Sequence, residues 1–159
     1  MDDLAIARAL HVLAIVLWIG GVAMVTTVLL PAVKKFKTAE ERLAFFEAVE
    51  RRFAWQARGT TLLAGASGFY MVDRLGQWTS ILSLQSWWLP AMVGIWSIFT
   101  ILLFVAEPLF LVRWLEKRAR REPDRTYALV QRLHWILLAA SLITLLGAVA
   151  GSHGLAFFG

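Results

Sequence analysis

Three histidines are the side chains of this chain best suited to ligand chemistry, because a neutral imidazole binds metal ions and haem iron. They are His11, His134 and His153. The chain has no cysteine, which excludes disulfides, thiolate-ligated clusters and the CxxCH attachment of c-type haem. No spacing resembles a hydrolase triad, a phosphate loop or a zinc motif. Which histidines can share a site therefore depends on the elements that carry them.

Four hydrophobic segments are the main elements of this sequence, in which 59% of the residues are hydrophobic. They cover residues 4–33, 59–72, 87–112 and 133–158. A membrane-spanning helix needs roughly 20 apolar residues, so all but the second qualify alone. The second becomes long enough if its helix begins upstream, near Phe53 or Trp55. The fold class that we predict is all-α: one integral membrane domain, residues 1–159, forming a four-transmembrane-helix antiparallel bundle.

The distribution of basic residues predicts the orientation of this bundle. Fourteen of the sixteen Lys and Arg residues lie within 34–58 and 113–132, and only Arg8 and Arg74 lie elsewhere. Basic residues resist translocation, so both stretches should face the cytoplasm and both termini the opposite, outer side. Nucleic-acid binding is disfavoured, because the basic residues flank spans and alternate with acidic ones.

Between the first two spans, the sequence TAEERLAFFEAVERRF predicts an amphipathic helix. Thr38 and Glu41 have capping-box spacing at its start. We expect this helix to lie at the inner interface or to rise into the second span. In the third span, Pro90 suits the first turn of a helix, whereas Pro108 should kink the span near its inner end.

Helix rise then separates the histidines by depth. His11 lies roughly 34 Å from Lys34 along its span and His153 roughly 31 Å from Arg132, so both belong to the outer leaflet. His134 follows Arg132 by two residues and belongs at the inner interface. His11 and His153 are therefore the candidate pair of ligands, with a fraying C-terminus as the plainer explanation of His153.

Other residues near the outer pair suit a prosthetic group. Arg8 lies one helical turn from His11, and Arg74 ends the second span on the same side, so both could bind haem propionates. The plainer alternative is that both arginines anchor the interface, with Asp73 neutralising one of them. Trp18 is a core packing residue or the wall of a buried planar ligand.

Methionines supply the alternative ligand set. Met71 and Met92 fall toward the outer ends of their spans, and thioether with imidazole suits copper(I) as well as haem iron. Core filling is the more common use of methionine. His134 is a weaker alternative ligand, because interfacial histidines more often contact headgroups or helix ends.

Glu107 is the least expected residue of the membrane interior, roughly 9 Å deeper than Arg113. Intramembrane carboxylates pair with a cation or relay protons. Arg58 and His134 are the candidate partners from neighbouring spans, and a structural pair with Arg58 is the favoured interpretation.

Small residues predict close helix contacts. Gly147 and Gly151 form a GxxxG motif, and Ala64 with Gly68 forms a similar pair in the second span. In lipid, such residues let helix backbones approach each other.

Three stretches carry a family resemblance: HVLAIVLWIGGVAMVTTVLLPAVKKF, RRFAWQARGTTLLAGASGFY and RLHWILLAASLITLLGAVAGSHG. Together they resemble the CopD and HemJ group of small bacterial membrane proteins, in an uncharacterised branch. The HemJ branch implies a b-type haem and protoporphyrinogen oxidation, and the CopD branch implies copper uptake or resistance. His11 is the residue carried over most directly.

These observations lead to three hypotheses. The first is a b-type haem protein of the bacterial inner membrane, an electron-transfer protein or oxidoreductase whose haem lies between His11 and His153, near Arg8, Arg74 and Trp18. The second is a copper-handling transport protein, and the third a cofactor-free accessory subunit. The expected partners are the lipid bilayer and a redox partner or larger membrane complex, with a homo-oligomer as a further alternative.

Overall fold

The computed structural model describes residues 2–36, 38–83 and 85–154, and this part of the chain is all-helical, without a β-strand. The predicted all-α class is confirmed. The first helical unit comprises α1 (Asp2–Met24), the π-helical η1 (Val25–Leu29) and α2 (Leu30–Phe36). The other elements are α3 (Ala39–Arg74), the 3₁₀ turn η2 (Thr79–Leu82), α4 (Trp88–Ile101), the π-helical η3 (Leu102–Leu111), α5 (Val112–Arg121) and α6 (Pro123–Ser152).

Helix α3 begins at the predicted capping box. The Thr38 backbone N–H donates to Glu41 Oε2 at 3.1 Å, and the Glu41 N–H donates to Thr38 Oγ1 at 3.4 Å. The helix then continues without a break to Arg74. Of the two predicted alternatives, the structure therefore has the one in which the amphipathic segment rises into the second hydrophobic segment.

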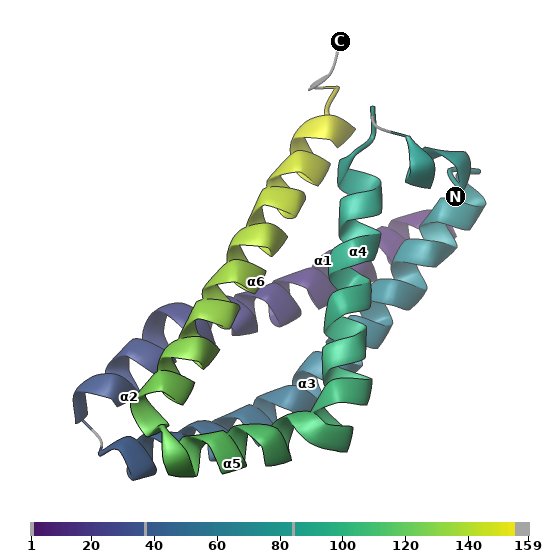
Figure 1. Ribbon diagram of the computed structural model, residues 1–159. Helices are drawn as coiled ribbons and strands as arrows, with labels where there is room; N and C mark the ends of the chain where they lie inside the picture. Colours follow the sequence, from purple (N-terminus) through teal and green to yellow (C-terminus); the bar gives the residue numbers. More distant parts are fainter. Residues whose placement is uncertain (1, 37, 84, 155–159) are drawn as a thin grey trace.

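Both π-helical segments contain or precede a proline. Pro31 follows η1 and brings no N–H to the helix, while the hydroxyls of Thr26 and Thr27 donate to the carbonyls of Val22 and Ala23 at 2.7 and 2.8 Å. Such side-chain bonds compete with the regular backbone ladder. Pro108 lies inside η3, beyond which α5 turns away from α4 and runs across the end of the molecule (Figure 1). The predicted kink is present, as a ten-residue π-helix.

Three helices of the described part are long and apolar enough to cross a membrane, which indicates a membrane protein. They cover Asp3–Lys35, Trp88–Arg121 and Pro123–Ser152. Helix α3 is long enough but less hydrophobic than these three, because polar and small residues interrupt its apolar half. Residues 155–158 of the fourth predicted segment lie outside the described residues.

The helices pack in two main contacts, α1 along α3 and α4 along α6. Figure 1 shows the start of α1, the end of α3, η2 and the end of α6 toward one end, here called the terminal end. The end of α2, the start of α3, the end of α5 and the start of α6 lie at the other, here called the basic end. A core cluster joins α1, α3, α4 and α6; its buried members are Ala14, Trp18, Ile19, Val22, Ala64, Phe99 and Leu138. A second cluster toward the basic end contains Val25, Leu30, Tyr127 and Val130.

The GxxxG glycines of α6 receive tryptophan rings. A Cβ at Gly147 would lie 2.5 Å from the ring of Trp87, and one at Gly151 would lie 2.5 Å from the ring of Trp88. Gly65 of α3 accommodates Trp96 in the same way. At the GxxxG glycines of α6, an indole ring therefore occupies the space left by each missing side chain, in place of the predicted close approach of a neighbouring helix backbone.

Candidate functional site

His11 lies in the contact between α1 and α3. Its Nδ1 is 2.9 Å from the carbonyl oxygen of Ala64 and 3.1 Å from Ser67 Oγ. A carbonyl can only accept, so Nδ1 carries the proton and Nε2 holds the ring's lone pair. The ring fits because α3 has a glycine there: a Cβ at Gly68 would lie 3.1 Å from His11 Cε1. Metal-ligating histidines commonly have this arrangement, with one ring nitrogen donating to a fixed acceptor.

The other two histidines bond to their own helix. His153 is exposed at the end of α6, where Nδ1 is 2.8 Å from the Val149 carbonyl. His134 is partly buried, with Nδ1 2.9 Å from the Val130 carbonyl. In the described part of the chain, no hydrogen bond joins His153 to His11. Their sharing of a ligand stays a prediction.

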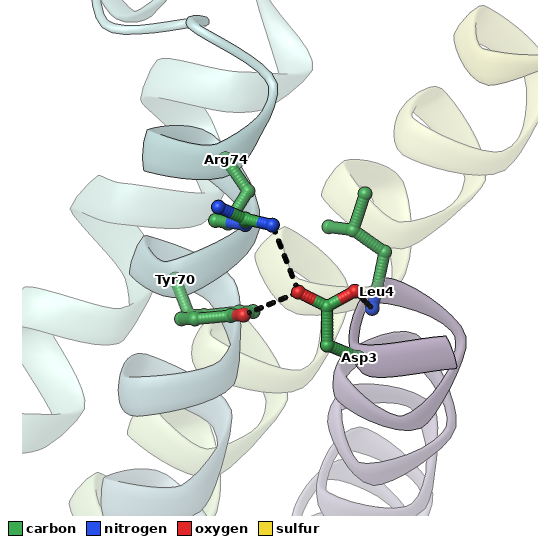
Figure 2. A network of polar contacts seen from close by, with 4 residues as sticks. All are labelled: Asp3, Leu4, Tyr70 and Arg74. Carbon is green, nitrogen blue, oxygen red and sulfur yellow. Dashed lines mark hydrogen bonds and ion pairs between the residues drawn. The ribbon is translucent and has the colours of Figure 1, made fainter. Parts of the chain in front are cut away.

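The two arginines of the terminal end differ in their partners. Arg74 forms an ion pair with Asp3 at 3.0 Å, and Tyr70 donates to the same carboxylate oxygen at 2.8 Å (Figure 2). The suggestion that Asp73 neutralises an arginine is wrong for Arg74; Asp73 accepts from the Trp78 indole at 3.1 Å. Asp3 also accepts from the Leu4 N–H at 3.0 Å. The bonds from Tyr70 and Arg74 to Asp3 join the start of α1 to the end of α3.

Arg8 is exposed, and among the described residues it has no ion-pair partner. It borders a shallow hollow on α1 together with Ala5, Ala9 and Val12. Arg8 is therefore the more accessible of the two predicted propionate partners, since Arg74 is engaged by Asp3.

Trp18 is a core residue. It is 2% exposed, and its ring meets that of Phe99 edge-on, with centroids 4.9 Å apart and planes at 89°. Among the described residues, its Nε1 has no hydrogen-bond partner. Trp18 is seven residues from His11, so it lies roughly 10 Å nearer the basic end.

The methionines proposed as alternative ligands are both partly buried. Met71 follows Ala64 and Ser67 by seven and four residues, so it lies on the face of α3 that contacts His11, one turn nearer the terminal end. Met92 belongs to α4. No hydrogen bond or ring contact links either methionine to a histidine in the described ranges.

Arg58 and Glu107 form the predicted ion pair, which is confirmed. Arg58 Nη2 is 3.1 Å from Glu107 Oε1, and each side chain is 20% exposed. Arg58 Nε also donates to the Leu103 carbonyl at 3.1 Å. In π-helical register that carbonyl would accept from residue 108, which is a proline without an N–H. Arg58 thus replaces the missing backbone donor while it neutralises Glu107.

A cavity of about 160 Å³ adjoins this ion pair. Residues of both π-helical segments line it, together with Trp18, Glu107 and His134. Pockets for small-molecule ligands commonly measure about 300–1,000 Å³, so this space is too small for a haem. Neither His11 nor His153 lines it. For haem, the donor chemistry of His11 fits, whereas this cavity does not.

Sequence reasoning missed the residues that hold His11. Ala64 and Gly68 carried a signal, but their small size indicated helix packing in general. Asp3 and Tyr70 carried no motif, because an ion-pair network between the ends of two helices depends on how those helices align.

Comparison of the chain with protein-family models, curated proteins and solved structures finds no match. The resemblance to the CopD and HemJ group therefore stays a prediction.

Proposed function

We propose that this chain is a bacterial inner-membrane protein that crosses the bilayer four times as an antiparallel bundle and holds a b-type haem through His11. The observation that supports the haem is the bond from His11 Nδ1 to the Ala64 carbonyl, at 2.9 Å. It fixes the tautomer whose Nε2 can bind iron, on an apolar helix where a histidine has few other uses. When bound, haem would supply a one-electron redox couple.

Each residue near His11 has a distinct part in this proposal. The Ala64 carbonyl holds the Nδ1 proton and so keeps the lone pair on Nε2. Gly68 leaves room for the ring. Arg8 is the proposed partner of a propionate, and His153 is the proposed second ligand. The position of His11 toward the terminal end supports the proposed electron transfer at the outer leaflet.

The test of the haem is an absorption spectrum of protein purified after expression with ample haem supply. We expect a Soret band that His11→Ala abolishes and that His134→Ala leaves intact. His134 is the matched control, because its Nδ1 also bonds to a carbonyl at 2.9 Å. Absence of the band from the unaltered protein, or its survival in His11→Ala, would overturn the proposal. His153→Ala shifts the band only if this residue is the second ligand.

A second pair of variants separates ligation from folding. Gly68→Leu would crowd the His11 ring, since even a Cβ at this position lies 3.1 Å from it. Gly59→Leu is the control in the same helix, because a Cβ at this position has no atom of the described residues within 4 Å. We expect only Gly68→Leu to lower haem occupancy while helix content is retained. Protoporphyrinogen oxidation, the activity that the HemJ resemblance implies, is assayed with the unaltered protein and the same variants.

Topology is tested by single cysteines, since the chain has none. With four spans, an impermeant maleimide added from outside labels Ser83→Cys and leaves Lys117→Cys unlabelled until the membrane is opened. If α3 did not cross and the N-terminus stayed outside, the order would reverse, because Ser83 and Lys117 would then exchange sides. Labelling only at Lys117→Cys therefore contradicts the proposed topology, in which four spans place both termini outside.

Copper(I) is a second candidate, favoured by the position of Met71 on the α3 face that contacts His11. A protein without haem that binds copper(I), and loses it in both His11→Ala and Met71→Leu, would select this function. Met92→Leu then tests whether α4 contributes a ligand. Protein that binds neither group, and copurifies with a larger complex, corresponds to an accessory subunit.

A further inference from the structure

Helix α5 has one apolar face and one basic face. Leu115 packs against the second core cluster, and Ala119 is 6% exposed. On the opposite side lie four basic residues that we name the basic arc: Arg113, Lys117, Arg120 and Arg121, all exposed. At about 100° per residue, they fall within an arc of roughly 100°, centred nearly opposite Leu115 and Ala119. The apolar face is used by the protein itself, which leaves the basic arc for another partner.

The basic arc is free of ion pairs within the described part of the chain. Glu122, the acidic residue at the end of α5, is shared by Arg118 at 3.9 Å and Arg125 at 3.2 Å. Neither of these arginines belongs to the basic arc. The four positive charges of the basic arc are therefore available to anions outside the chain.

The position of α5 indicates which anions these are. The helix continues from a segment apolar enough to span a membrane, and beyond Pro108 it runs across the basic end (Figure 1). Trp114 on α5 is 46% exposed, with the Arg118 guanidinium 5.5 Å from its ring centroid. Exposed tryptophans at the ends of spanning helices lie at the level of the lipid headgroups.

We propose that the basic arc binds the headgroups of anionic phospholipids in the leaflet at the basic end. Guanidinium groups form paired, charge-assisted hydrogen bonds with phosphate oxygens. Each Lys or Arg of a basic cluster next to a span raises the affinity for anionic lipid about fivefold. This proposal rests on the proposed insertion of the protein into a membrane, and it does not depend on haem binding.

The test uses the neighbouring tryptophan as a reporter. The protein is placed in phosphatidylcholine vesicles that contain either brominated phosphatidylglycerol or the same amount of brominated phosphatidylcholine. Trp114 fluorescence is obtained as the difference from Trp114→Phe. We expect several-fold stronger quenching by the anionic brominated lipid, with the excess falling as salt is added.

Two charge variants complete the test. Replacing all four residues of the basic arc by Gln should remove the excess quenching. Lys34→Gln with Lys35→Gln, on α2 at the same end, should keep it. Equal quenching by the two lipids in the unaltered protein would overturn the proposal and would fit a basic arc that binds a soluble acidic protein. Excess quenching that persists in the four-residue variant, with helix content unchanged, would also overturn it.

Discussion

Removing Glu107 would leave the Arg58 guanidinium without its ion-pair partner, where both side chains are only 20% exposed. Exposed pairs contribute about 0–1 kcal/mol, whereas breaking a buried pair costs about 3–5 kcal/mol. For this intermediate exposure we expect Glu107→Ala to lower the free energy of unfolding by about 2 kcal/mol.

Arg58→Met should cost more, because it also leaves the Leu103 carbonyl without its side-chain donor. An unpaired acceptor adds about 1 kcal/mol, which gives a total of about 3 kcal/mol. The double variant loses the same ion pair only once, in addition to the unpaired Leu103 carbonyl, so it should cost about 3 kcal/mol rather than the additive value of about 5 kcal/mol. The expected coupling energy is therefore about 2 kcal/mol.

The measurement is equilibrium unfolding in mixed micelles of a mild detergent and dodecyl sulfate, followed by tryptophan fluorescence. Arg125→Met and Glu122→Ala form the matched control cycle, since this pair is 3.2 Å apart but 76% and 42% exposed. Its coupling should stay below about 0.5 kcal/mol. Additive losses for Arg58 and Glu107, no larger in coupling than the control, would refute the assignment of a membrane ion pair.

Two further predictions concern helix contacts. Gly65→Ala should destabilise the fold by about 1–3 kcal/mol, because the new Cβ would lie 2.6 Å from Trp96 Nε1, and Gly59→Ala, with open space at its Cβ, should be neutral or slightly stabilising in the same unfolding assay. Asp3→Asn should cause a small loss of thermal stability at low salt that disappears at high salt, because its pair with Arg74 is exposed to solvent; a loss independent of salt would contradict this explanation.

The sequence predicted well those features that depend on local pattern. Thr38 and Glu41 form their capping box, and Pro90 lies in the first turn of α4. Arg58 and Glu107 could be paired in advance because each is a charge on an otherwise apolar stretch, where an ion needs a partner.

Features that depend on how helices align were less predictable. A kink at Pro108 was expected, but not that Arg58 would bond to the Leu103 carbonyl, since this contact depends on the π-helical register. For His11, helix rise gives the depth, and the rotation and alignment of α1 against α3 decide its neighbours. Its bond to Ala64 and its position beside Gly68 are therefore structural findings, while sharing a ligand with His153 stays a prediction.

The weak hydropathy of α3 has a consequence for how the protein is made. The insertion machinery accepts helices that are apolar enough on their own, and the segments around α1, α4 and α6 meet that condition. In the proposed four-span topology, the hydrophobic segment within α3 would enter with help: α1 offers Asp3 and His11 as polar partners, and Glu107 reaches Arg58 only after the following span has been synthesised. During biogenesis, α3 would then remain beside α1 until Glu107 is inserted and forms its ion pair with Arg58.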